Sequence, residues 1–400
     1  MKIGAWQEER TAGRMRLSLR VQWEDRARDD ATIWFEWPEA LADQVTADAN
    51  VALLAAYPLA MSTGEQRLQL DGTVPPRLAD GVRAAMALAV QRTPALRTVR
   101  LDVIERGTAP EGTAGRREAA LCLSGGVDAL SALQGNLEAM PPDHPARFRR
   151  GLFVFGLNSF DFADGLPVPA RAELYEARAA RLTEFASGLG ISLIRAATNL
   201  RSLYPDFEAW SAVVNNTPLT AIGHAMRTHL SGLAIASTGL GICTDVLQHP
   251  FMDPLFATHD FDVHPVQQML TRAEKVRRLA AWPEWLAVLR VCFLMELPTG
   301  PVLNCGRCEK CVRTMLELLA VGGDALARAP FPADDVTADQ IDGLSFTSRN
   351  VVGYYDEVLA PLAALGRDDL VAAIRRGLRR YNTSEPRDPS GWRDLWGRLK

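Results

Sequence analysis

The chain has 400 residues, 48% of them hydrophobic and 23% charged, so it is long enough for two or three domains with sizeable cores. The formal net charge of -4 and the sequence pI of about 5.9 disfavour a generally basic nucleic-acid binder. No basic segment followed by an apolar run opens the chain, and no stretch approaches the roughly 20 apolar residues of a membrane helix. We therefore expect a cytoplasmic protein that does not enter a membrane.

Residues 1–110 are predicted to form an α+β accessory domain. Apolar and polar residues alternate over Met15–Trp23, a pattern typical of a half-buried strand. Further strands are predicted over Thr32–Trp37 and Thr98–Ile104, with a helix over Arg77–Gln91 and another opening at Pro38. No catalytic constellation is visible in this part of the sequence.

A Gly- and Pro-containing linker over Arg106–Arg117 precedes a segment of different character, residues 118–320. Short apolar runs alternate there with helical stretches such as Ala172–Leu189. The runs are Ala119–Leu123, Gly151–Gly156, Ile191–Ile194 and Leu233–Ser237. This alternation predicts an α/β fold with a doubly wound parallel sheet, which binds ligands at the carboxyl ends of its strands.

Residues 325–400 are predicted to be a helical C-terminal region. The stretch Leu370–Arg380 is basic on one side, and a solvated helix face is the preferred interpretation of that charge. No internal repeat or low-complexity segment is present.

A glycine-containing loop is the most informative feature of the second segment. The run Ser124-Gly125-Gly126-Val127-Asp128 lies between a predicted strand and a predicted helix. Glycines allow the backbone to approach a ligand, and the backbone N–H groups before a helix bind anions such as phosphate. Ser124 can donate to a phosphate oxygen, and Asp128 suits Mg²⁺, which bridges carboxylate and phosphates. An ordinary Gly-Gly turn is the alternative interpretation.

Three cysteines, Cys305, Cys308 and Cys311, fall within seven residues, spacing that favours a metal site over a disulfide framework. Zn²⁺ takes four ligands in tetrahedral geometry, and a site closed by four protein ligands is structural. Cys292 is the preferred fourth ligand. The alternatives for that ligand are Cys243, His249, His259 and His264. An iron–sulfur cluster and unligated thiols remain open as other interpretations.

The loop resembles the Ser-Gly-Gly-x-Asp-Ser signature of the PP-loop ATP pyrophosphatases, with Ser124, Gly125, Gly126 and Asp128 matching. Together with the cysteines and Arg313, it resembles the 7-cyano-7-deazaguanine synthase family over roughly residues 118–319. The resemblance implies a tetra-cysteine zinc site at Cys292, Cys305, Cys308 and Cys311. The run Thr271–Val276 resembles the family's lysine-containing helix start, which makes Lys275 a candidate contact for phosphate or activated substrate.

The resemblance also implies a reaction, that of an AMP-forming carbon–nitrogen ligase. ATP and Mg²⁺ would bind at Ser124–Asp128, with Asp128 and Lys275 as catalytic residues, and a carboxylate like that of 7-carboxy-7-deazaguanine would become an acyl adenylate. Ammonia would then displace AMP to give an amide, and a second adenylation would give a nitrile. The added length raises the hypothesis that the amine belongs to a larger partner, even a protein terminus. A homodimer is implied by resemblance alone.

Other interpretations of the chain remain open. A PP-loop enzyme that modifies tRNA also combines such a loop with cysteines, although the acidic pI disfavours nucleic acid. A degenerate scaffold subunit is favoured by Ala129, which stands where the family has serine. His249 and Asp253, in a Pro-containing loop after the fourth apolar strand, are candidate substrate contacts.

Overall fold

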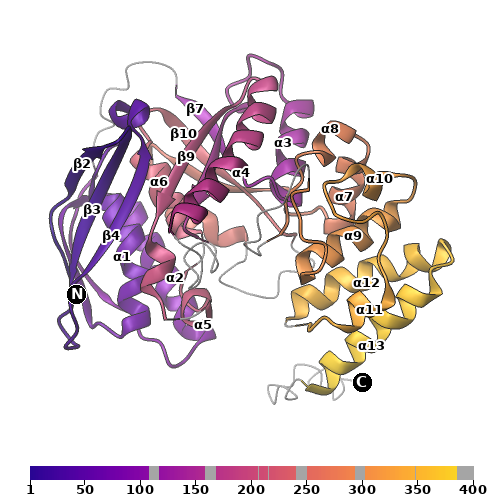
Figure 1. Cartoon of the computed structure of the whole chain (residues 1–400). Helices are drawn as coiled ribbons and strands as arrows, with labels where there is room; N and C mark the ends of the chain where they lie inside the picture. The colour runs from indigo at the N-terminus through magenta and orange to yellow at the C-terminus, as the bar shows by residue number, and fades with distance from the viewer. Residues whose placement is uncertain are drawn as a thin grey trace, which may run out of the picture.

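The computed structural model describes residues 1–107, 117–157, 168–205, 207–214, 216–239, 250–292, 302–346 and 348–384. Within these ranges, eleven strands form one sheet in the order β11-β10-β7-β8-β9-β4-β3-β1-β5-β6, with β2 paired to β3. Most of the strand pairings are parallel, so the fold is mixed α/β. Figure 1 shows the sheet running from the indigo N-terminal segment into the magenta centre, with the orange and yellow helices beyond it.

The strands have the following bounds: β1 Lys2–Ile3, β2 Gln7–Thr11, β3 Arg14–Gln22, β4 Ala31–Pro38, β5 Arg67–Val74, β6 Arg100–Glu105, β7 Glu118–Cys122, β8 Phe148–Phe155, β9 Ser192–Thr198, β10 Leu230–Ala236 and β11 Asp262–Val266.

The α-helices are α1 Ala49–Thr63, α2 Pro76–Arg92, α3 Val127–Ala139, α4 Val168–Gly188, α5 Phe207–Ser211, α6 Thr217–Ala225, α7 Arg272–Ala280, α8 Pro283–Leu286, α9 Glu309–Val321, α10 Ala325–Arg328, α11 Ala338–Asp342, α12 Arg349–Ala364 and α13 Asp368–Ser384. The 3₁₀ helices are η1 Glu39–Gln44, η2 Leu200–Leu203 and η4 Pro250–Phe256.

The N-terminal segment follows its sequence pattern in part. β3 buries every second side chain, as its alternation predicts, and the helix expected at Pro38 is the 3₁₀ helix η1. α1 was not predicted. Asp48 caps it by accepting from the N–H groups of Asn50 and Val51, and Gly64 (φ 75°) ends it. All its side chains except that of Ser62 are buried, so it lacks the polar face that produces helical periodicity.

The N-terminal strands and the parallel strands are joined at one seam. β4 pairs antiparallel with β9 through Phe35 opposite Thr198 and Glu36 opposite Ala197. Asn199 reinforces the seam, because its Oδ1 accepts from Trp34 N at 2.9 Å and its Nδ2 donates to Thr32 O at 2.7 Å. The segments on either side of the predicted linker therefore share a single sheet. Most of that linker, residues 108–116, lies outside the described residues.

The parallel part of the sheet positions the candidate site. Its strands β9, β8, β7, β10 and β11 are mutually parallel, and the strand order reverses at β7. Ala120 and Leu233 face a core shared with α1, α2 and α6, whereas Leu121 and Ala234 face a core shared with α3, α4 and α7. Helices thus cover both faces, and the strand order reverses beside the carboxyl ends of β7 and β10, where sheets of this kind bind ligands.

The helices after residue 302 form one cluster on the side of the sheet away from the N-terminal strands (Figure 1). α9 packs against α7 and α12, and α13 packs against α11 and α12. The predicted basic face of α13 is partly paired, since Arg376 Nε donates to Asp342 at 3.1 Å and Arg380 bonds the same carboxylate. No helix in the described ranges combines the length and apolar character that crossing a membrane requires. Residues 385–400 lie outside the described residues.

Candidate functional site

The glycine loop lies between β7 and α3, at the point where the strand order reverses. Gly125 has φ 77°, a left-handed conformation that favours glycine, and Gly126 (φ −81°) is the N-cap of α3. Ser124 Oγ accepts from Gly126 N at 3.3 Å. No side chain caps α3 within the described residues. The first-turn N–H groups of α3 and the helix dipole therefore make the start of this helix suitable for an anion.

Asp128, in the first turn of α3, is held by two cations from α7. Lys275 Nζ lies 2.9 Å from Asp128 Oδ1, and Arg272 Nη1 lies 3.4 Å from Oδ2. Lys275 also donates to the carbonyl oxygen of Ser237, directly after β10. Its side chain is fully buried, whereas that of Asp128 is 24% exposed. Lys275 therefore joins the carboxyl end of β10 to the start of α3.

Arg272 extends this network to α9. Its Nε donates to Glu317 Oε1 at 2.7 Å, and its Nη2 donates to Thr314 Oγ1 at 3.0 Å. Arg272 and Glu317 are both buried, and the ring of Tyr354 from α12 lies 5.5 Å from the guanidinium carbon of Arg272. Burial raises the pKa of the Glu317 carboxyl, and the charge of Arg272 opposes that rise. Four helices thus contribute to the surroundings of Asp128.

The four predicted metal ligands converge. The Sγ atoms of Cys292, Cys305, Cys308 and Cys311 all lie within 4.8 Å of one another. Cys305 Sγ is 3.8 Å from Cys311 Sγ, and Cys308 Sγ is 4.0 Å from Cys292 Sγ. Thiolates at about 2.3 Å from a tetrahedral zinc ion are separated by about 3.8 Å, so the cluster fits Zn²⁺. Hydrogen bonds with Cys308 and Cys311 lower the pKa of Cys292, and the same contacts raise the pKa of Cys308 and of Cys311.

Local structure explains why the cysteines converge. Gly306 adopts φ 70° in the turn between Cys305 and Cys308, and Cys308 N donates to Cys305 Sγ at 3.4 Å. Cys308 is the N-cap of α9, so Cys311 lies in the first turn of that helix. The alternative ligands Cys243 and His249 lie outside the described residues, and the ring of His264 faces Asp262 at 2.8 Å instead.

Asn304 joins the cysteine cluster to the chain before it. Its Oδ1 accepts from Val291 N at 2.8 Å and from Cys292 N at 3.1 Å. Its Nδ2 donates to the carbonyl oxygens of Leu289 at 2.9 Å and Pro330 at 3.2 Å. In the same segment, Arg290 N donates to Gly125 O at 2.8 Å, so the chain leading to Cys292 is bonded to the glycine loop.

The predicted substrate contacts are placed in part. His249 lies outside the described residues. Asp253, in η4, is 2% exposed and accepts from Asn216 Nδ2 at 2.8 Å, at the start of α6. Burial raises the pKa of Asp253 to about 7. The pKa of the Cys122 thiol is raised by burial first and by the negative charge of Asp253 second. Asp253 therefore lies near the carboxyl end of β7, on the sheet face opposite α3.

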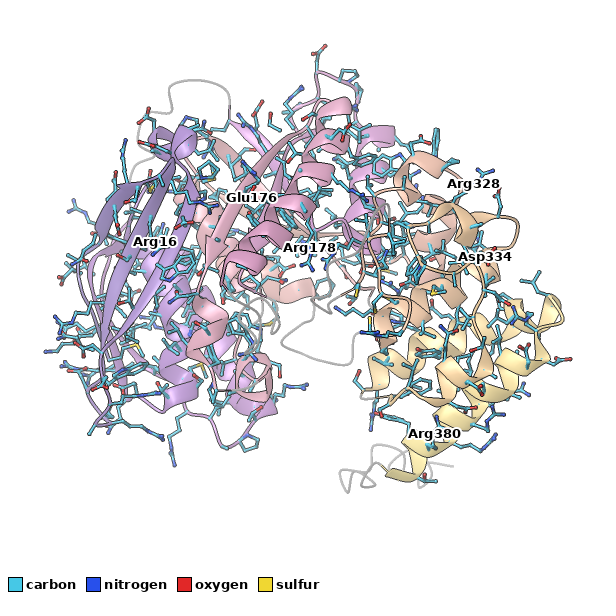
Figure 2. The ribbon with its side chains drawn as sticks, viewed as in Figure 1. Arg16, Glu176, Arg178, Arg328, Asp334 and Arg380 are labelled. Atoms are coloured by element: carbon cyan, nitrogen blue, oxygen red, sulfur yellow. The ribbon has the colours of Figure 1, made fainter. Side chains whose placement is uncertain are left out.

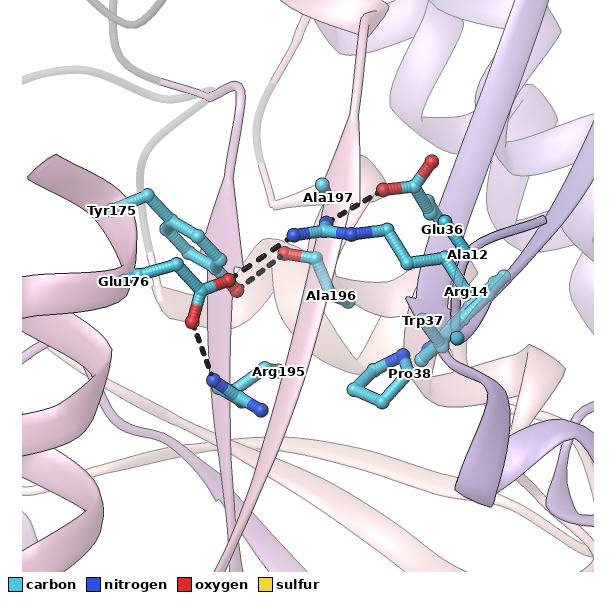
Figure 3. A pocket seen from close by; sticks show the side chains of 11 residues that line it. Ala12, Arg14, Glu36, Trp37, Pro38, Tyr175, Glu176, Arg195, Ala196 and Ala197 are labelled. Carbon is cyan, nitrogen blue, oxygen red and sulfur yellow. Dashed lines mark hydrogen bonds and ion pairs between the residues drawn. The ribbon is translucent and has the colours of Figure 1, made fainter. Parts of the chain in front are cut away.

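Two hollows lie beside these elements. A small one borders Ser124 and Gly125, and Phe153 and Leu182 are among its lining residues. Arg178 of α4, labelled in Figure 2, lines it as well. A larger one, of about 170 Å³, lies at the seam of β4 and β9. Figure 3 shows Arg14 there between Glu36 and Glu176, at 2.8 and 3.2 Å, and Glu176 continuing to Arg195 at 2.7 Å. Because these charges satisfy one another, the seam hollow is an ion-paired junction.

The sequence singled out Asp128 and Lys275, which form an ion pair, and the four cysteines, which converge, but it did not indicate Arg272, Glu317 and Asn304. The spacing of Arg272 and Lys275 at i, i+3 was the available signal, because it puts both cations on one face of α7. Thr314 and Glu317 have the same spacing on α9. Asn304 gave no signal, since nothing local indicates which backbone groups a buried amide will bond.

No protein-family model, characterised protein or solved structure matches the chain.

Proposed function

We propose that the chain is an AMP-forming enzyme of the PP-loop type, in which ATP binds at Ser124–Asp128 and activates a carboxylate for attack by an amine. The observation that carries the proposal is the position of the Gly125–Gly126 turn, between β7 and an uncapped helix N-terminus at the reversal of strand order. In open α/β sheets, ligands bind at such reversals, and phosphate binds at such helix starts.

In this proposal the phosphates lie against the first-turn N–H groups of α3 and the hydroxyl of Ser124. A single carboxylate suits Mg²⁺ as one ligand among phosphate oxygens and water, so Asp128 fits that role when nucleotide is bound. Lys275 keeps positive charge beside Asp128 and holds that carboxylate against the end of β10. A carboxylate oxygen of the acceptor attacks the α-phosphorus, the bond to pyrophosphate breaks, and an amine later displaces AMP to give an amide.

The acceptor we propose is a carboxylate similar to 7-carboxy-7-deazaguanine, with Asp253 as a contact. A buried carboxyl group can accept from a ring N–H when ionised and donate when protonated. The four-cysteine cluster would hold zinc without an open position, and thus stabilise the helices around the site without reacting. Conversion of the amide to a nitrile, a homodimer and a protein-borne amine remain further hypotheses.

A second candidate, a scaffold subunit without catalysis, is favoured by one observation. Both oxygens of Asp128 face cations, Lys275 and Arg272, so Mg²⁺ must compete with an ion pair. Ala129 also lacks the hydroxyl that serine would offer to phosphate. In this candidate the network is structural, and the glycine loop binds no nucleotide.

The deciding experiment measures AMP formation by the purified protein from ATP and 7-carboxy-7-deazaguanine, with and without ammonia, together with the mass of the product. AMP and a changed deazaguanine mass support the proposed reaction, and the mass distinguishes amide from nitrile. Bound ATP without AMP would indicate another acceptor. Absence of ATP binding would refute the enzyme proposal and favour the scaffold, which Ala129→Ser then tests.

Variants of the ion pair test the roles of its members. Asp128→Asn and Lys275→Met should each reduce AMP formation by at least about 100-fold, because the first removes the carboxylate proposed to bind Mg²⁺ and the second removes a positive charge beside the phosphates. Asp324→Asn is the matched control for the first, since its carboxylate is exposed on the surface. Lys2→Met is the control for the second, because Lys2 is half exposed. Equal activity in Asp128→Asn and its control would remove Asp128 from the mechanism.

A further inference from the structure

Asn304 is a fully bonded amide between two parts of the metal site. It is 1% exposed, and its oxygen accepts two hydrogen bonds while its nitrogen donates two. An amide side chain has two acceptor sites and two donors, so all four are used. An isolated amide in an apolar core would be costly to bury, whereas a fully bonded one fixes the segments that it bonds.

The two segments that Asn304 joins supply different metal ligands. Leu289, Val291 and Cys292 belong to the first, and Asn304 directly precedes Cys305 in the second. Twelve residues separate Cys292 from Cys305, so bringing these cysteines together closes a loop and costs chain entropy. The side chain of Asn304 spans this closure with bonds to backbone groups on the far side.

We propose that Asn304 is the positioning residue of the four-cysteine site, holding Cys292 against the Cys305–Cys311 turn before a metal ion binds. The inference depends on the metal site proposed above and adds a residue that the cysteine spacing does not indicate. The bonds of Asn304 should raise the affinity of the site for a metal ion, because cysteines that are already in place lose less entropy on binding than cysteines that the metal must bring together.

The same bonds reach the glycine loop. Arg290 lies between Leu289 and Val291, the partners of Asn304, and its N–H bonds Gly125 O. The carbonyl oxygen of Val288 lies 3.6 Å from where a Cβ on Gly125 would be. Asn304 therefore also fixes the backbone on which the left-handed turn at Gly125 rests.

The test compares Asn304→Ala with a matched control, Asn136→Ala. Asn136 also bonds across a loop, since its Oδ1 accepts from Phe148 N at 2.8 Å and its Nδ2 donates to Ala146 O at 3.0 Å. Zinc affinity is measured by competition with a chromophoric chelator, and unfolding is followed in parallel. Asn304→Ala should weaken zinc binding by about 10- to 100-fold, the range for residues that orient metal ligands. Asn136→Ala should lose stability without a change in zinc affinity.

A measurement on the unaltered chain decides the matter if Asn304→Ala does not fold. Hydrogen exchange at Val291 and Cys292 is followed with zinc bound and after its removal. Both amides should stay protected without zinc, because Asn304 and not the metal is their acceptor. Loss of protection on zinc removal, or equal zinc affinity in Asn304→Ala and wild type, would overturn the inference. Failure of the wild type itself to bind zinc would instead refute the metal site.

Discussion

Replacing Asp253 by asparagine should stabilise the protein in a way that depends on pH. The carboxyl group of Asp253 is 2% exposed, and among the described residues its bonded partner is the neutral amide of Asn216, with no cation shifting its pKa. Burial without a counter-charge disfavours the ionised form, which is why the pKa rises from 3.8 to about 7. An asparagine keeps the oxygen that accepts from Asn216 and cannot ionise.

The pH dependence of the free energy of unfolding follows from the protons that the folded and unfolded chains bind. Between pH 3.8 and about 7 the unfolded chain has released the Asp253 proton while the folded protein retains it, so the free energy of unfolding falls as pH rises. Below this window the group is protonated in both states, and above it the loss is complete. A shift of about three pKa units corresponds to about 4 kcal/mol, at about 1.4 kcal/mol per unit. Asp253→Asn should therefore match wild type near pH 4 and exceed it by about 4 kcal/mol near pH 8.5.

Urea unfolding of both proteins at several pH values gives the difference directly, because carboxylates common to both cancel. Asp324→Asn, with its carboxylate 63% exposed, is the control for removing one charge without removing a buried one. A difference between Asp253→Asn and wild type that does not vary with pH would refute the reasoning, since it would mean that Asp253 ionises as readily in the folded protein as in the unfolded chain.

Two further predictions concern the helices around Asp128 and the cysteine turn. Arg272→Met leaves Glu317 buried without its cation, so the free energy of unfolding should fall by about 3–5 kcal/mol, whereas Arg278→Met, which breaks an exposed pair with Glu138, should change it by less than about 1 kcal/mol in the same urea assay. Gly306 has φ 70°, and Gly306→Ala would put a Cβ 2.6 Å from Pro332 Cγ. The turn that carries Cys305 and Cys308 would have to shift, so zinc content after purification should fall. Gly322 also has a positive φ (87°) but has open space around it, so Gly322→Ala should retain zinc, and equal zinc in both variants would contradict the argument.

Features that depend on residues close in sequence were predictable. The alternation of β3, the apolar strands β7 and β10, the glycine turn and the cysteine spacing all arise from local geometry. α1 was missed for a physical reason, because a helix buried on all sides lacks the amphipathic period by which helices are recognised.

Features that join distant segments were not predictable from one sequence. The pairing of β4 with β9 is set by the meeting of strands more than 150 residues apart, and nothing in either strand specifies its partner. The bonds of Asn304 and the pair of Arg272 with Glu317 are of the same kind. Asn, Arg and Glu side chains are usually exposed to solvent, and only the fold reveals that Asn304, Arg272 and Glu317 are buried and bonded.

α9 connects the cysteine cluster to the ion-pair network around Asp128. Cys308 and Cys311 lie at its start, while Thr314 and Glu317 lie one and two turns further along and bond Arg272, which faces Asp128. An α-helix moves as a unit over such a distance, because its backbone hydrogen bonds fix each turn to the next. A metal ion that holds the first turn therefore also fixes the position of Glu317, and through Arg272 it restrains the carboxylate beside the glycine loop. On this argument the cysteine cluster matters to the glycine loop even though its four thiolates leave no coordination position open to a substrate.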